Sequence, residues 1–393
     1  MNILAFDLPN CNHQNLVKLI ESDHNVYRCG YGDQSYLISL GIKNLPGFDY
    51  MDFLGESNKS QIIKKVIRDH NIDIVIVSDP VMGFLSGDLK YDVTYIGPST
   101  YVSNMETDKI QAMEFVASCG VSVPKVLGRY QSDQFDSLSW SKPLVVKPAR
   151  RWSPAIICHE GEDEALQEAL SNEYPHEIFL QEYVDTTWET SINYTIIGDE
   201  YLITVIKHDG NIDRNYGVHS RDWYTDVYMV DLDPESEHIV RTYGEKILSK
   251  LVKLYPGNHE GTITGFLTDS GDWYFGEFNI RRSMHNSIPS YMDGDAWLTA
   301  MQGDMSTYRA AWTDKKLIQV VIHTTHEHAE SERYPIELHD TYPGIHKPAG
   351  LKSDFMTCSG GVIISTESEH RDIMDKFISE LESTTNFKAN RPY

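Results

Sequence analysis

Residues Phe275–Arg282 read FGEFNIRR and follow a turn-rich segment, as the second strand of a β-hairpin would. Side chains two positions apart point to the same face of an extended strand. Glu277, Asn279 and Arg281 are therefore predicted to form one row, with Phe275 in the same row. A strand that serves only the core has no need of a carboxylate, an amide and a guanidinium side by side. The segment is therefore a candidate functional site.

A second polar side chain ends an apolar strand earlier in the chain. Lys147 closes the run PLVVKP, and a lysine there is costly unless it meets an anion. The alternative is a lysine whose amine reaches the surface. Residues Phe179–Asp185 read FLQEYVD, another strand that runs into a polar segment, and Glu189 follows. The order is a lysine strand, QEYV, a further glutamate, a long helix and then EFN, and this order carries the functional signal.

Length and composition exclude several classes of protein. The chain has 393 residues, which suggests two or three domains. No apolar run approaches the ~20 residues that span a bilayer, and MNILAFDLPNCNHQ at the start lacks the basic and apolar regions of a signal peptide. The five cysteines are scattered and never form a CxxC pair. This argues against a disulfide framework or a zinc site and for a reducing, cytoplasmic location.

The net charge limits the kinds of partner that the protein can bind. The sequence has 34 lysine and arginine residues against 58 aspartate and glutamate residues, a formal net charge of −24. Such a field repels phosphate backbones, so no nucleic-acid polymer is expected as a partner. An anionic small molecule can still bind in a locally basic pocket. No membrane partner is expected, and a monomer and a homodimer are both compatible with these features.

Residues 1–100 alternate apolar, strand-like runs with helical patterns. IDIVIVSD, residues 72–79, is an apolar run of the type buried in a parallel sheet. The alternation predicts a βαβ sheet and an α/β fold. Ligands of such sheets bind beyond the carboxyl ends of the strands, so LPNCNHQ (8–14) and SDPVMGFLSG (78–87) are candidate binding loops.

Two further units follow. Residues 101–314 are predicted to hold a helix that stops at Gly120, strands on either side of a polar turn after Lys147, more strands, a long helix over 235–256, and a hairpin that ends at Asn279. Residues 315–393 are predicted to hold two strands, 316–325 and 358–368, and a closing helix, 369–384. The sequence contains no internal repeat and no low-complexity linker.

This order of segments resembles that of the ATP-grasp ligases, and within them that of the phosphoribosylamine–glycine ligases. The similarity is strongest in IGPSTYVSNMETDKIQAMEFVASCGVSVPK, residues 96–125. PLVVKP is similar to the family's lysine strand, FLQEYVDTTWETSIN (179–193) to its hinge, and GTITGFLTDSGDWYFGEFNIR (261–281) to its metal-binding hairpin. The resemblance extends over nearly the whole chain, including segments 318–339 and 358–368.

The resemblance implies a particular fold and reaction. The fold would be a doubly wound substrate-binding domain over 1–100, an ATP-grasp domain of two α+β subdomains over 101–314 with a lid at about 121–184, and a small α+β domain over 315–393. ATP would lie between the subdomains with Mg²⁺ (or Mn²⁺) on its phosphates. Enzymes of this kind phosphorylate a small-molecule carboxylate, such as glycine or another amino acid, and a small-molecule amine then displaces the phosphate.

The resemblance also implies roles for individual residues. Glu277 and Asn279 would bind the metal, since Mg²⁺ prefers oxygen ligands. Arg281 would contact the transferring phosphoryl group, and Lys147 would act with it in catalysis. The nucleotide would be held by two lysines, a hinge and a ribose-binding glutamate, namely Lys109, Lys147, Gln181, Glu182, Tyr183, Val184 and Glu189.

The sequence departs from the family pattern in its substrate loops. The family's glycine-rich loop after the lysine is here PARRWSP, residues 148–154, without glycine. The family's acceptor loops are replaced by different sequences around 10–13, 213–223 and 282–287. Candidate substrate contacts in the changed loops are His13, Arg214 and Arg282. A changed amine or carboxylate substrate is the simplest interpretation.

Two alternatives remain at the level of sequence. A non-catalytic nucleotide-binding relative that kept the fold would explain the glycine-free loop. The retained pair Glu277 and Asn279 argues against it, because an idle site does not need a carboxylate beside an amide. A different ATP-grasp chemistry, such as a carboxylase or a peptide ligase, is the second alternative, and no biotin or lipoyl lysine motif supports it.

Overall fold

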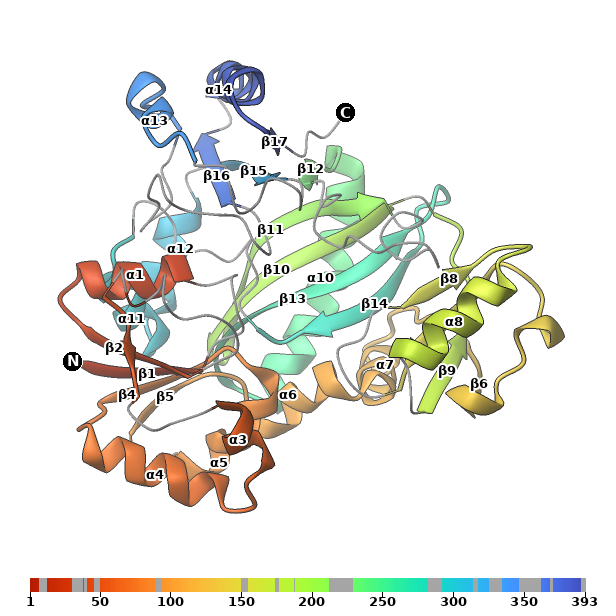
Figure 1. The fold of residues 1–393 in the computed structure, drawn as a ribbon, viewed down its shortest axis with the longest axis horizontal. Coiled ribbons are helices and arrows are strands. Elements are labelled where there is room, and N and C mark those ends of the chain that lie inside the picture. The colour runs from red at the N-terminus through yellow and green to blue at the C-terminus, as the bar shows by residue number, and fades with distance from the viewer. Residues whose placement is uncertain are drawn as a thin grey trace.

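The structure is a computed structural model. It describes residues 1–6, 13–29, 38, 41–45, 50–89, 93–149, 155–173, 177–186, 188–211, 229–281, 292–313, 317–324, 334–345, 362–367 and 370–389. Four β-sheets lie in these residues. Figure 1 shows the N-terminal sheet at one end of the molecule, the long central sheet in the middle, and the sheet that holds β6 and β9 at the opposite end.

The N-terminal sheet is parallel, with the strand order β3-β2-β1-β4-β5. Its strands are β1 (Asn2–Phe6), β2 (Asn25–Cys29), β3 (Lys43–Asn44), β4 (Ile74–Val77) and β5 (Thr94–Ile96). The helices among them are α1 (His13–Glu21), α3 (Tyr50–Gly55), α4 (Lys59–Asp69), the short 3₁₀ helix η1 (Pro80–Phe84) and α5 (Leu85–Leu89). All four residues of β4 are buried, as expected for a strand covered on both faces. The predicted βαβ sheet is confirmed.

The two faces of this sheet are covered by different parts of the chain. On one face α1 packs together with α11 (Gly294–Met301) and α12 (Met305–Thr313), around a core that includes Trp297. On the other face α4 and α5 pack around Ile63. Residues 292–313 thus follow the predicted hairpin that ends at Asn279 in sequence but return to the N-terminal sheet, beside α1 in Figure 1.

The central sheet is antiparallel, with the order β12-β11-β10-β13-β14. Its strands are β12 (Met229–Asp231), β11 (Glu200–Asn211), β10 (Trp188–Gly198), β13 (Gly257–Leu267) and β14 (Trp273–Asn279). One face packs against three helices, α6 (Thr100–Thr107), α7 (Lys109–Ala117) and the long α10 (Pro234–Leu254). Asp233 caps α10 by accepting hydrogen bonds from the backbone N–H groups of Glu235 and Ser236. The predicted hairpin that ends at Asn279 is confirmed.

A four-stranded antiparallel sheet has the order β6-β9-β7-β8. Its strands are β6 (Val126–Gln131), β7 (Leu144–Pro148), β8 (Ile156–Cys158) and β9 (Glu177–Gln181), and it packs against α8 (Asp163–Glu173) and the 3₁₀ turns η2 (Ser132–Gln134) and η3 (Ser137–Ser139). β7 and β8 are the two strands predicted around a polar turn. Residues 150–154 of that turn lie outside the described ranges.

The C-terminal sheet has the order β16-β15-β17 and is antiparallel. Its elements are β15 (Leu317–Thr324), α13 (Leu338–Thr341), β16 (Val362–Glu367), α14 (Arg371–Thr384) and β17 (Phe387–Ala389). The two predicted strands and the closing helix are confirmed. β17 was not predicted; it adds an edge strand after the helix, and its Phe387 is buried in the small core of this unit.

Within the described ranges, no helix has both the length and the apolar character needed to cross a membrane. The cysteines described there, Cys29, Cys119 and Cys158, are free thiols. Burial raises the pKa of the Cys29 thiol, so this side chain stays protonated and behaves as a small apolar residue.

A buried histidine lies in the central sheet. His259 on β13 meets the ring of Tyr194 edge-on, with ring centres 6.0 Å apart. No group in the described part of the chain hydrogen-bonds to either ring nitrogen. Burial lowers the pKa of His259 from 6.5 to about 4. Between these values the unfolded chain binds a proton that the folded protein does not, so stability falls as the pH falls through this interval.

We expect the substitution His259→Phe to remove this acid sensitivity. On going from pH 7 to pH 4.5, the free energy of unfolding should fall by about 2 kcal/mol more in the wild type than in the variant. Urea unfolding at the two pH values measures the difference. His238→Phe, at an exposed position of α10, is the matched control and should behave like the wild type. An equal loss of stability in the wild type and in His259→Phe would contradict the role of His259.

Candidate active site

The central sheet has a polar face on the side opposite to α10. The strand register aligns side chains of four strands in two rows across this face. The first row consists of Lys207, Ser191, Thr264 and Glu277. The second row consists of Val205, Asn193, Thr262 and Asn279. Most of these polar side chains are buried, so the face holds polar groups away from bulk water instead of simply being solvated.

A β-bulge in β14 decides which of its side chains reach the polar face. The register shifts at Gly276, which is the extra residue. Phe275 therefore lies in the apolar core, with its ring centre 5.1 Å from that of Phe278, and the prediction that it shares a row with Glu277 is wrong. The predicted placement of Glu277 and Asn279 on one face is confirmed by the register.

A chain of polar contacts runs along the end of β14. Lys109 Nζ, at the start of α7, lies 3.1 Å from Glu277 Oε2. Asn279 Nδ2 donates to Glu277 Oε1 at 3.3 Å, and Arg281 Nη2 donates to Asn279 Oδ1 at 3.0 Å. The Glu277 side chain is 31% exposed, whereas that of Lys109 is 9% exposed. The carboxylate is thus within reach of a ligand while its cationic partner is held in the protein.

The electrostatic balance keeps Glu277 ionised. Burial alone would raise its pKa, but the ammonium groups of Lys109 and Lys147 lower the pKa below its usual value. A carboxylate with a lowered pKa stays charged at neutral pH and can therefore bind a cation. The site thus combines a charged carboxylate, which can bind a cation, with two lysines, which can bind an anion.

Glu106 was missed as a site residue by the sequence reasoning. Its carboxylate is buried and accepts a hydrogen bond from Arg281 Nε at 2.9 Å and another from the Ile280 backbone N–H at 2.5 Å. Burial raises the pKa of Glu106, while Arg281 opposes that shift. The available signal was the spacing to Lys109, since Glu106 lies in the last turn of α6 and Lys109 begins α7.

Lys147 of β7 faces the central sheet from the four-stranded sheet. Its side chain is buried, with Nζ 3.3 Å from the carbonyl oxygen of Gly276 and 5.8 Å from the ring centre of Phe266. Burial, together with the neighbouring charge of Lys109, lowers the pKa of Lys147 to about 8, against the opposing effect of Glu277. The structure places both Lys109 and Lys147 beside the end of β14, and the prediction that they contact the phosphates of ATP stays a prediction.

A small apolar cluster lies next to Lys147. Val145 and Ile157 are buried there, and Ala155, Tyr183 and Phe266 pack against them. Val145 lies two positions before Lys147 on β7, so both side chains point to the same face of that strand. The sequence reasoning missed this cluster, because alternate residues of a strand carry no mark of which face meets a ligand.

Hydrogen bonds hold the predicted hinge in place at the end of β9. Gln181 Nε2 donates to the Pro124 carbonyl oxygen at 3.3 Å. The Glu182 N–H donates to the Lys125 carbonyl oxygen at 2.9 Å, and Glu182 Oε1 accepts from the Lys125 N–H at 2.9 Å. The backbone and the side chain of Glu182 thus both hold the segment before β6, and Tyr183 packs on the apolar cluster.

The remaining predicted residues fall in two groups. Glu189 is buried at the start of β10, where its charge acts on Lys147. His13 begins α1, but its side chain lies outside the described residues. Arg214 and Arg282 lie outside the described ranges. The structure thus brings together Lys109, Lys147, Glu189, Glu277, Asn279 and Arg281. The roles of all the predicted site residues stay predictions.

The donor set fits one kind of metal. In the described part of the chain, no cluster of three or more His, Cys, Asp or Glu side chains could hold a metal ion by itself. Mg²⁺ commonly takes one or two carboxylates and completes its shell with water and phosphate oxygens. Glu277 and Asn279 supply one carboxylate and one amide oxygen at adjacent positions of one face. They fit Mg²⁺ or Mn²⁺ bound together with phosphates, not a zinc centre.

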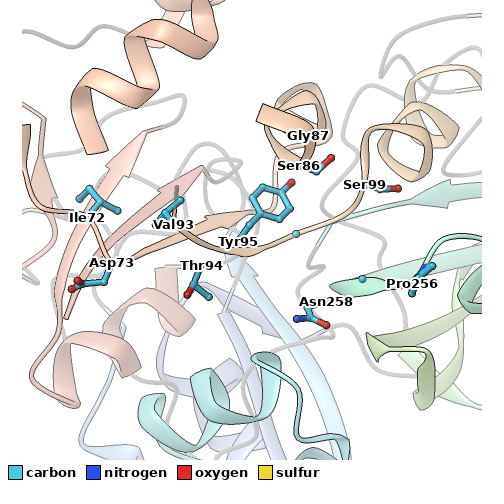
Figure 2. A pocket seen from close by; sticks show the side chains of 12 residues that line it. Ile72, Asp73, Ser86, Gly87, Val93, Thr94, Tyr95, Ser99, Pro256 and Asn258 are labelled. Atoms are coloured by element: carbon cyan, nitrogen blue, oxygen red, sulfur yellow. The ribbon is translucent and has the colours of Figure 1, made fainter. Parts of the chain in front are cut away.

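A cavity of about 930 Å³ lies elsewhere, at the amino ends of β4 and β5. Figure 2 shows Asp73, Thr94 and Tyr95 on one side of it and Asn258 on the other. Asp73 is already bonded, since it accepts from the Asn2 N–H at 2.7 Å. Ser86 and Gly87 of the candidate binding loop 78–87 line this cavity, whereas neither Lys147 nor Glu277 does, so the cavity is separate from the polar contacts along β14.

Solved structures resemble the chain over nearly its full length. Phosphoribosylamine–glycine ligase from Thermotoga maritima matches with a TM-score of 0.63 at 13% identity, over 100% of both chains. L-amino acid ligase from Bacillus licheniformis matches with a TM-score of 0.64 at 12% identity, over 100% of this chain and 99% of that chain. N5-carboxyaminoimidazole ribonucleotide synthetase from Thermotoga maritima matches with a TM-score of 0.63 at 15% identity, over 99% of both chains.

These neighbours share the ATP-grasp fold, and the chain described here has that fold. No family model and no curated protein sequence matches the chain. The predicted fold class is therefore confirmed by structure alone. Phosphoribosylamine–glycine ligase is similar to this chain to the same degree as ligases with other substrates, so the comparisons show the fold and not the substrate.

We expect Lys147→Met to stabilise the ligand-free protein. The pKa of Lys147 falls from 10.5 to about 8 on folding, so at pH 7 its buried charge costs about 3 kcal/mol. The wild type should regain this stability as the pH rises from 8 towards 10.5, and the variant should not. Chemical unfolding at pH 7 and pH 9.5 measures both effects, with Lys253→Met on the exposed face of α10 as control. A less stable Lys147→Met protein would mean that the contacts of the lysine outweigh its burial.

Proposed function

We propose that the protein is an ATP-dependent carboxylate–amine ligase that needs Mg²⁺ or Mn²⁺ and acts through an acyl phosphate. The observation that carries the proposal is the convergence of Lys147 from β7, Lys109 from α7 and the pair Glu277 and Asn279 from β14. Cations facing a carboxylate and an amide form the charge pattern that a metal-bound triphosphate requires.

In this proposal the nucleotide lies between the four-stranded sheet and the central sheet. The adenine packs on Val145, Ile157 and Tyr183, which form an apolar surface beside Lys147. Backbone groups of residues 182–184 face the adenine edge, and Glu189 accepts from the ribose hydroxyls. The support is that Tyr183 of the hinge belongs to the apolar surface and that Phe266 of the same surface lies beneath the amine of Lys147.

The proposed reaction has two displacements. A carboxylate oxygen of the first substrate attacks the γ-phosphorus of ATP, the bond to the bridging oxygen breaks, and ADP leaves. The amine nitrogen of the second substrate attacks the acyl carbon, the bond to the phosphate oxygen breaks, and inorganic phosphate leaves while the amine releases a proton. Lys109, Lys147 and Arg281 stabilise the charge on the transferring phosphoryl group. A bound divalent cation supplies further charge neutralisation.

We infer that the carboxylate substrate binds along the polar face beyond Glu277. The first row ends at Lys207, three strands away, and a strand spacing of ~4.8 Å makes this span about 14 Å. The span suits a small molecule such as glycine or another amino acid, with the buried Lys207 at its far end. His13, Arg214 and Arg282 are proposed to contact the amine substrate.

ADP release tests the proposal directly. The purified protein is incubated with MgATP and a panel of amino acids crossed with small amines, including glycine and phosphoribosylamine, and ADP and phosphate are measured. We expect ADP release that depends on both substrates. MgADP binding without turnover on any pair would favour the non-catalytic alternative. ADP release that needs bicarbonate instead of an amino acid would favour the carboxylase alternative.

Glu277→Ala is expected to abolish this turnover, with a loss of at least about 10³-fold, because the metal and the phosphates lose their charged ligand. Calorimetry should also show that MgADP binds the variant about as weakly as metal-free ADP. Glu114→Ala, at an exposed position of α7, is the control and should keep full activity. Full turnover in Glu277→Ala would remove the metal assignment.

Ile157→Ala is expected to weaken ADP binding about tenfold, because the adenine loses one wall of its apolar surface, a loss of about 1 to 1.5 kcal/mol. Binding of Mg-tripolyphosphate, which has no base, should stay unchanged. Ile156→Ala is the matched control, since Ile156 packs in the core on the other face of the sheet. That variant should lose stability and keep its ADP affinity. Equal effects of the two variants on ADP affinity would exclude the adenine surface.

A further inference from the structure

One helix junction holds both ends of the polar chain along β14. Lys109 pairs with Glu277, and Glu106 pairs with Arg281. Both partners on the helical side lie at the break between α6 and α7, where Asp108 caps α7 by accepting from the Gln111 N–H. Because a short rigid segment holds the two ends, the positions of the intervening side chains on β14 depend on each other.

Glu106 accepts two hydrogen bonds from the residues that follow β14, one from a backbone N–H group and one from a side chain. One carboxylate oxygen accepts from the Ile280 N–H and the other from Arg281 Nε. A backbone N–H needs only a neutral acceptor, which an amide oxygen supplies equally well. The ion pair with Arg281 needs the charge. The second contact therefore requires a glutamate where a glutamine would satisfy the first.

The ion pair sets the direction of the guanidinium. Nε donates to Glu106, and Nη2 of the same planar group donates to Asn279. Because the guanidinium is planar and rigid, fixing Nε fixes the plane of the whole group. The Glu106 side chain is 4% exposed and that of Arg281 is 29% exposed, so the anchor is inside the protein and the anchored group reaches the site.

We propose that Glu106 is a positioning residue of the site: it holds Arg281 so that the guanidinium meets the phosphoryl group during transfer. The proposal rests on the proposed function. Glu106 does not touch the reacting atoms and acts through Arg281. It therefore contributes to capture of the transferring phosphoryl group and not to binding of the nucleotide itself, which depends on Lys147, Lys109 and the apolar surface.

A double-mutant cycle tests this division of roles. The variants are Glu106→Gln, Arg281→Gln and the two combined, with Glu114→Gln as an exposed control on α7. Calorimetry measures the affinity for MgADP alone and for MgADP with aluminium fluoride, which mimics the transferring phosphoryl group. Thermal unfolding is recorded for every variant. Turnover is measured with any substrate pair found active.

Each single variant is expected to weaken binding of the aluminium fluoride complex about 10- to 100-fold, the usual effect of losing a hydrogen bond to a charged group. Affinity for MgADP alone should change by less than about threefold. The combined variant should be no weaker than Arg281→Gln by itself, because Glu106 acts only through that residue. Should Glu106→Gln fail to fold, Glu106→Asp is expected to show the same selective loss.

Three results would overturn the proposal. Additive losses in the combined variant would show that Glu106 acts independently of Arg281. Equal loss of affinity for MgADP with and without aluminium fluoride would show a general structural role, and so would a lower unfolding temperature with unchanged affinities. The ligase function fails separately: selective coupling between Glu106 and Arg281 without turnover on any substrate would uphold the positioning role and reject the ligase.

Discussion

The β-bulge at Gly276 is the constraint on which the site depends. A regular strand keeps Phe275 and Glu277 on one face, so either an aromatic ring would leave the core or a carboxylate would enter it. The extra residue shifts the alternation, and Phe275 joins Phe278 in the core while Glu277 faces the polar side. Gly276 itself turns its carbonyl oxygen to Lys147, which ties the four-stranded sheet to the central one.

Positive charge is concentrated around Glu277, although the molecule as a whole is strongly negative. In a chain with a net charge of −24, Lys109 and Lys147 both lie beside Glu277, and Arg281 lies four residues beyond it. Burial makes each cation costly, and the lowered pKa of Lys147 shows that the nearby carboxylates do not offset the cost. A buried lysine that lowers the stability of the fold is typical of a site that binds an anion. Functional sites commonly retain residues that reduce stability.

Long and regular sequence patterns predicted the fold well. The apolar run of β4, the hairpin of β13 and β14 and the strands on either side of the turn after Lys147 all form as expected, because each depends on local periodicity. The prediction that Phe275 shares a face with Glu277 was wrong. A single glycine inside a strand does not show from the sequence whether it forms a β-bulge and so shifts the register. β17 was missed because a short edge strand after a helix has too few residues to show a period.

The chemistry of the site divides in the same way between sequence and tertiary structure. The sequence by itself determined that a lysine ends one apolar strand and that a carboxylate and an amide share a face of another, because side-chain spacing along one strand is a local property. Only the tertiary structure decided that Glu106 holds Arg281 across 175 residues of chain and that Val145 and Ile157 form an apolar surface beside Lys147. These contacts join distant segments, and the free energy that selects them belongs to the packed sheets and helices, not to any one stretch of sequence.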